Sequence, residues 1–287
     1  MGKKLKTYAD WRLSESMFEY NFYVKQFKRL LYTMFKWSNL PIGVTSRFVE
    51  RTLYHYGKMV LYKDAGVLIM SRCTEEGINR YEEPLAYNTL SITGNGKIIK
   101  ADKAVPLYND AFKEGNVFNV NFFAKKISNI EKTIDVNLEQ LKQPSILSVP
   151  EGQKLTAEQL WQKKTNGEPI ILVTDDFMSG MEKIDVFDLK IKNYIPDLDD
   201  TKMKYINQAL TFFGINNVNI QKRERLITGE AEQNDEQINY NLNAMLRPRE
   251  EFCEAANKKF NIYPPISVEV DKEAIEENVE AIRALAS

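Results

Sequence analysis

Few side chains in this sequence have the types and spacings that catalysis requires. It contains one histidine, His55, and two cysteines, Cys73 and Cys253, so a Cys/His zinc site is excluded. A Ser-His-Asp or Cys-His-Asn triad would have to use His55, which stands between Tyr54 and Tyr56, where aromatic packing is the expected role. The glycine motifs GxxxxGK(S/T) and GxGxxG, which cradle phosphates, are both absent. The sequence therefore favours a non-enzymatic protein without a metal or cofactor.

Two pairs of adjacent acids remain as candidates for magnesium chemistry. Asp175 with Asp176, and Asp199 with Asp200, could each supply carboxylate ligands, but neither pair has a third ligand in view. A turn and a helix cap are the roles that we predict for them. The glycine-rich segment 94–97 separates two β-like runs and predicts a hairpin turn rather than a phosphate loop.

Composition narrows the class of protein further. The chain has 287 residues, with 39 Lys and Arg against 40 Asp and Glu, and 43% of its residues are hydrophobic. This length allows one large domain or two ordinary ones with a real core. No apolar run approaches the roughly 18 residues of a transmembrane helix, and the basic start is not followed by the apolar region of a signal peptide. Two isolated cysteines indicate a reducing compartment.

Hydrophobic spacing predicts the elements of the N-terminal half. A helix with apolar residues from Tyr20 to Met34 is expected to end before Pro41. The region 44–118 is rich in β-like runs, with a hairpin whose turn is at 63–66. The strands expected there are 59–62, 67–70, 85–93, 97–100 and 104–108.

The C-terminal half is expected to contain two long helices that enclose an insert. The helices are 120–143, with a single apolar stripe, and 199–213, which ends at Gly214. Polar residues 228–243 contain four acids and no Lys or Arg, and predict a long mobile loop. The remaining elements expected are the insert's strand 146–149, helix 156–164 and strand 169–174, then helix 248–260, strand 266–270 and a final helix to residue 286.

The narrow apolar stripes on the two long helices leave two interpretations open. Their other faces are charged, so neighbouring copies of the chain could cover the stripes. The alternative is an ordinary helical hairpin that lies on the chain's own core.

Four blocks of sequence resemble one protein family in the same order. Residues 30–41 (LLYTMFKWSNLP) and 211–219 (TFFGINNVN) form the first two blocks. Residues 222–228 (KRERLIT) with 234–238 (NDEQI), and then Arg249, Glu250 and Glu251, form the others. Together they resemble the head–tail connector (portal, upper collar) proteins of small podoviruses of the phi-29 type.

The resemblance implies an α+β portal fold that is assembled as a ring around a central channel. It has an α-helical stem, an α/β clip insert and a mixed wing. The implied boundaries are wing 1–118, stem helix 119–144, clip 145–196, stem helix and connection 197–225, channel loop 226–246 and C-terminal wing 247–287.

The function that the resemblance implies is a dodecameric channel for packaging and ejecting double-stranded genomic DNA. The implied location is the capsid vertex of the virion, after synthesis in the host bacterial cytoplasm. A near-neutral subunit suits a channel that must not grip its polyanion. The implied partners are non-specific DNA, the major capsid and scaffolding proteins, a lower collar or tail protein, a separate packaging ATPase and a packaging RNA, with no membrane.

The resemblance also assigns site residues. Lys202 or Lys204 would face the channel, and because the two side chains point about 200° apart on a helix, one of them is expected to do so. The channel loop would contribute Glu230, Glu232, Asp235 and Glu236. The basic residues Lys3, Lys4 and Lys6 would contact the packaging RNA or motor, with a solvated tail as the alternative.

Two competing functions make different predictions. A nucleic-acid-binding module that uses the basic N-terminus would bind DNA tightly and salt-sensitively as a monomer. An enzyme that uses Asp175 and Asp176 would show metal-dependent turnover.

Overall fold

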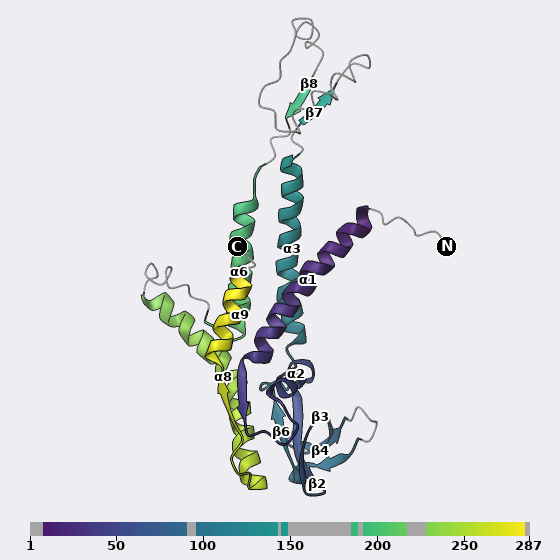
Figure 1. The fold of residues 1–287 in the computed structure, drawn as a ribbon, viewed down its shortest axis with the longest axis vertical. Helices are drawn as coiled ribbons and strands as arrows, with labels where there is room; N and C mark the ends of the chain where they lie inside the picture. The colour runs from purple at the N-terminus through teal and green to yellow at the C-terminus, as the bar shows by residue number, and fades with distance from the viewer. Residues whose placement is uncertain are drawn as a thin grey trace, which may run out of the picture. The chain divides into compact units, whose positions relative to one another are not determined.

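The computed structural model has a mixed α+β fold that divides into two units (Figure 1). It describes residues 8–90, 96–142, 145–148, 185–188, 192–216 and 228–284. The larger unit is Met1–Glu131 with Asp200–Ser287, and the smaller unit is Lys132–Asp199. None of the helices in these described ranges is long and apolar enough to cross a membrane.

An antiparallel sheet of five strands forms the β-rich part of the larger unit, in the order β5-β4-β3-β2-β6. The predicted hairpin is confirmed, since Tyr62 pairs with Ile69 in the register of β2 and β3. The strands are β2 (Lys58–Asp64), β3 (Val67–Ile78), β4 (Pro84–Thr89), β5 (Ile98–Lys100) and β6 (Ala104–Tyr108), and the 3-10 turn η1 (Ala101–Lys103) precedes β6.

The first helix ends earlier than the sequence predicts. Helix α1 (Tyr8–Thr33) stops eight residues before Pro41, and strand β1 (Phe35–Ser38) follows it. Strand β1 pairs antiparallel with β9 (Ser267–Val270). Phe35 and Trp37 are both buried, because alternate residues of a strand point to the same face. The prediction that the helix continues to Pro41 is therefore wrong. Residues 35–38 form a strand instead, because they pair with β9, which lies more than two hundred residues away in the sequence.

A helix that the sequence did not predict lies within the β-rich region. Helix α2 (Ser46–Tyr56) begins after Thr45, whose side chain accepts a hydrogen bond from the backbone N–H of Phe48 at 3.2 Å. It ends at Gly57, whose φ of 71° is the left-handed conformation that glycine adopts at least cost.

The main core joins helices from all parts of the chain. Its buried residues include Phe27 of α1, Ile127 of α3 and Phe213 just beyond α6. The predicted long helices are confirmed as α3 (Val117–Lys142) and α6 (Ile195–Phe212). The C-terminal strand and final helix are also confirmed, as β9 and α9 (Lys272–Ala284).

The loop predicted at 228–243 is a helix instead. It forms the first half of α8 (Thr228–Phe260), which continues through Pro248. Glu, Gln and Ala are good helix formers, and acids near a helix N-terminus interact favourably with its dipole. Met245 is buried in the main core, with Leu242 and Leu246 packed against that core, and Ile238, two turns before Met245, is buried as well. Helix α8 changes direction along its length (Figure 1), and Pro248 gives a reason, since proline cannot donate the helical hydrogen bond.

The smaller unit contains part of the predicted insert. Strands β7 (Ser145–Ser148) and β8 (Asp185–Asp188) form an antiparallel pair. Buried Asn137 of α3 donates to the carbonyl of Lys192 at 3.1 Å and accepts from the backbone N–H of Tyr194 at 3.0 Å. These bonds attach the start of α6 to α3. The predicted helix 156–164 and strand 169–174 lie outside the described residues, as does the 94–97 turn in part.

Candidate functional site

A buried polar cluster joins three helices at the position of the predicted channel lysines. Lys202 of α6 is 6% exposed, and its Nζ lies 3.4 Å from Oε1 of Glu131 on α3. The hydroxyl of Tyr23 on α1 donates to the same oxygen at 2.6 Å. Burial, together with the bond to Glu131, raises the pKa of Tyr23 well above its ordinary value, so this phenol stays protonated as a donor.

The two candidate channel lysines lie in different environments within the protomer. Lys202 is buried and its ammonium faces Glu131 within the chain. Lys204 is exposed on the same helix, as the two-residue spacing requires. Of the two lysines, Lys204 is therefore the one at the surface of the protomer.

Replacing Lys202 by methionine is expected to lower the free energy of unfolding by about 1–3 kcal/mol, because Glu131 would lose its ionic partner in a largely buried position. The matched variant Lys204→Met should change it by less than about 0.5 kcal/mol, as for most exposed sites. Urea unfolding of both variants measures the difference. Equal midpoints would contradict a structural role for Lys202.

The other predicted site residues are not gathered into one cluster. Glu230, Glu232 and Asp235 lie on the helical backbone of α8, and their side chains are outside the described part of the structure. Glu236 is exposed on α8. Lys3, Lys4 and Lys6 lie outside the described residues, as do Asp175 and Asp176. Asp199 and Asp200 are inside α6 rather than at its cap, because the helix begins four residues earlier than predicted.

The predicted packing role of His55 is confirmed. Its ring lies 4.9 Å from that of Tyr54, and Nε2 is hydrogen-bonded to the Tyr32 hydroxyl at 3.2 Å. Burial lowers the pKa of His55, and the nearby charges of Lys28 and Arg51 lower it further. Within the described ranges, no group of three His, Cys, Asp or Glu residues could hold a metal ion.

Sequence reasoning missed a buried ion pair that joins α8 to the N-terminal region. Arg249 and Glu50 are 1% and 2% exposed, with Nη2 and Oε2 2.8 Å apart and Nε and Oε1 3.1 Å apart. Arg249 also donates to the backbone oxygen of Asn109 at 3.1 Å, and its guanidinium lies 4.2 Å from the Phe35 ring centre. The indole of Trp37 donates to Glu50 at 2.8 Å. Arg249 lies in one of the sequence blocks that carry the family resemblance, whereas no sequence pattern singled out Glu50.

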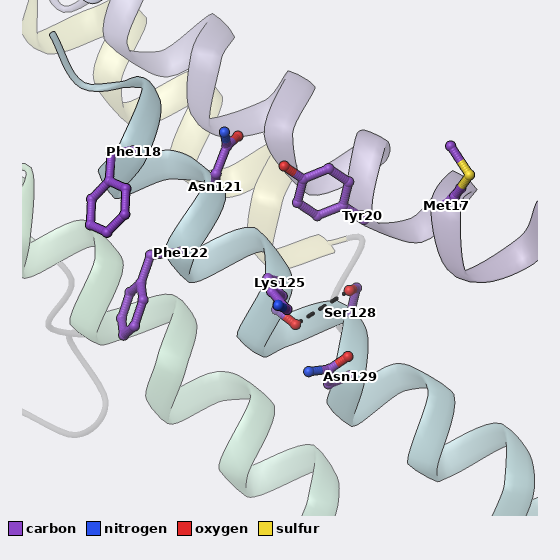
Figure 2. A pocket seen from close by; sticks show the side chains of 8 residues that line it. All are labelled: Met17, Tyr20, Phe118, Asn121, Phe122, Lys125, Ser128 and Asn129. Atoms are coloured by element: carbon purple, nitrogen blue, oxygen red, sulfur yellow. Dashed lines mark hydrogen bonds between the residues drawn. The ribbon is translucent and has the colours of Figure 1, made fainter. Parts of the chain in front are cut away.

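An open groove lies between α1 and α3 (Figure 2). Its volume is about 530 Å³. Its walls combine exposed apolar side chains with amides and one lysine, and the residues are Met17, Tyr20, Phe118, Asn121, Phe122, Lys125, Ser128 and Asn129. Such a lining offers no reacting groups and suits the binding of a partner's surface.

The chain is similar to one protein family and to solved structures of phage portal proteins. The family described as Phage Connector (GP10) matches residues 6–275. A structure described as the portal and tail of native bacteriophage P68 is similar with a TM-score of 0.54 and 13% identity, over 99% of each chain. A portal protein of the HK97 family from Corynebacterium diphtheriae is similar with a TM-score of 0.42 and 10% identity, over 96% of this chain and 99% of that one. At such identities the P68 match shows the fold.

Proposed function

The chain belongs to the phage connector family and has the fold of a phage portal protein, and we propose that its copies assemble into a ring whose channel conducts double-stranded DNA during packaging and ejection. A ring of twelve is the number that the resemblance implies. The observation that supports the proposal most is the set of large apolar side chains left exposed on the two long helices: Phe118, Phe122 and Leu138 of α3 and Phe212 of α6. Exposed aromatic and aliphatic groups of this size indicate an assembly surface.

We assign the parts of the portal fold by the domain boundaries given above. Helices α3 and α6 form the stem, and residues 145–196 form the clip. Residues 226–246 are proposed to border the channel, and those from Thr228 onward are helical rather than a loop. In the virion, the ring would contact the major capsid and scaffolding proteins on one side and a lower collar or tail protein on the other. A separate packaging ATPase would drive translocation, and the segment with Lys3, Lys4 and Lys6 would contact that motor or a packaging RNA.

Lys204 is the channel residue that we propose for DNA contact. It is exposed on α6, and a ring would repeat its charge once per subunit, while the buried Lys202 would contribute none at the surface. One weak phosphate contact per subunit retards DNA without gripping it.

Virions assembled with Lys204→Ala are therefore expected to form normal rings but to retain less DNA after packaging stops. Nuclease-protected genome per particle is the measurement, and Lys63→Ala, which removes an exposed lysine of the five-stranded sheet, is the control. Wild-type retention by the Lys204 variant would remove this residue from the channel.

A further inference from the structure

The groove between α1 and α3 is uncovered in the protomer. Phe118 is 78% exposed and Met17 65% exposed, while Phe122 is about half exposed. Figure 2 shows the two phenylalanines side by side along one wall, with Lys125 following them on the same helix. Exposed apolar side chains of this size, gathered in an open groove of about 530 Å³, indicate a surface that binds a partner.

Charge restricts the kind of partner that fits. Lys125 is the charged side chain of the groove's lining, and residues 117–130 of α3, which form one wall, contain Lys125 and Lys126 and no Asp or Glu, while Glu19 stands between the lining residues Met17 and Tyr20 on α1. Complementary potential therefore requires an occupant that is acidic as well as partly apolar.

One segment of this chain is both acidic and partly apolar. Residues 228–243 of α8 contain four acids and no Lys or Arg. Tyr240 is 75% exposed, and Glu236, one turn earlier on the same face, is exposed too. Ile238, which lies between them in the sequence, is buried, so Glu236 and Tyr240 are on the outward side of the helix.

The dimensions agree as well. The groove wall from Phe118 to Asn129 is about 16 Å long, and the helical segment 228–240 is about 18 Å long, at 1.5 Å per residue. Figure 1 shows the N-terminal ends of α1 and α8 on opposite sides of α9, so the segment is placed to reach a neighbour. Two different, complementary surfaces on one subunit give a head-to-tail contact, the kind that generates a ring when the rotation between subunits closes.

We propose that the groove of one subunit receives the N-terminal half of α8 from a second copy of the chain. The two helices run antiparallel, with Tyr240 against Phe118 and Phe122 and with Glu236 against Lys125. This is helix-in-groove recognition, with an aromatic anchor and a charged rim. The inference rests on the proposed ring and names the contact that builds it.

The test is cross-linking of purified rings of the double variant Lys126→Cys/Gln237→Cys with a short bismaleimide. Both positions are exposed, and both native cysteines are buried, with burial raising the pKa of each thiol to about 12, so neither competes for reagent. Denaturing gels are expected to show a ladder of covalent oligomers beyond the dimer. The matched pair Lys63→Cys/Gln237→Cys places the first thiol on the five-stranded sheet and should leave monomers.

A charge swap provides a second readout on the full chain. Lys125→Glu and Glu236→Lys should each lower the fraction of assembled rings by about tenfold, and the two together should restore it. Rings without a ladder and without rescue would overturn the inference and leave the groove to DNA phosphates or another capsid protein, while the proposed channel would stand. Wild-type protein that forms no rings would overturn the proposed function and this contact with it.

Discussion

Replacing Arg249 by methionine is expected to lower the free energy of unfolding by about 3–5 kcal/mol, the usual cost of removing one partner from a buried ion pair. Glu50 would keep a charge in a site that is 2% exposed, with only the Trp37 indole as a described donor. The carbonyl oxygen of Asn109 would lose the bond from Arg249 as well. Urea unfolding at equal protein concentration measures the loss.

The double variant Arg249→Met/Glu50→Gln separates charge from packing. Glutamine keeps an acceptor for Trp37 but carries no charge, so the double variant should be more stable than Arg249→Met alone. A loss below about 1 kcal/mol in the single variant would show that the pair does not hold α8 to the N-terminal region.

Replacing Leu138 by aspartate is expected to abolish assembly while leaving the subunit folded. Leu138 is 42% exposed on α3, so the protomer tolerates a carboxylate there. In a ring that covers this stripe, each interface would bury an unpaired charge, which costs well above the roughly 1.4 kcal/mol that corresponds to a tenfold weaker association.

Gln140→Asp is the matched control, since it adds the same charge to an exposed residue about 200° away on the same helix. Circular dichroism reports the fold and native mass spectrometry reports the assembly state. Monomers with wild-type helicity for Leu138→Asp, and rings for Gln140→Asp, are expected. Rings from both variants would show that the α3 stripe is not an interface.

The parts of the fold that depend on local pattern were predicted from the sequence. The β2–β3 hairpin follows from a turn between two apolar runs, and α3 and α6 follow from helical spacing. Strand β1 was missed because its partner, β9, lies more than two hundred residues away, and local spacing alone favoured a longer α1.

Composition misled the prediction at α8. The acids of 228–243 suggested a loop, whereas Ile238 and Met245 were a helical signal that the polar surroundings obscured. The spacing of Lys202 and Lys204 correctly indicated that the two would differ in environment. It could not indicate which is buried, since that depends on Glu131 and Tyr23 on two other helices.

Native mass spectrometry of the purified wild-type chain tests the central claim most directly. The subunit mass is 33.3 kDa, so a twelve-membered ring would be observed near 400 kDa. A closed oligomer of that order, with a central channel in electron micrographs, is the result that we expect. A species that stays at the mass of one subunit at micromolar concentration would contradict the account.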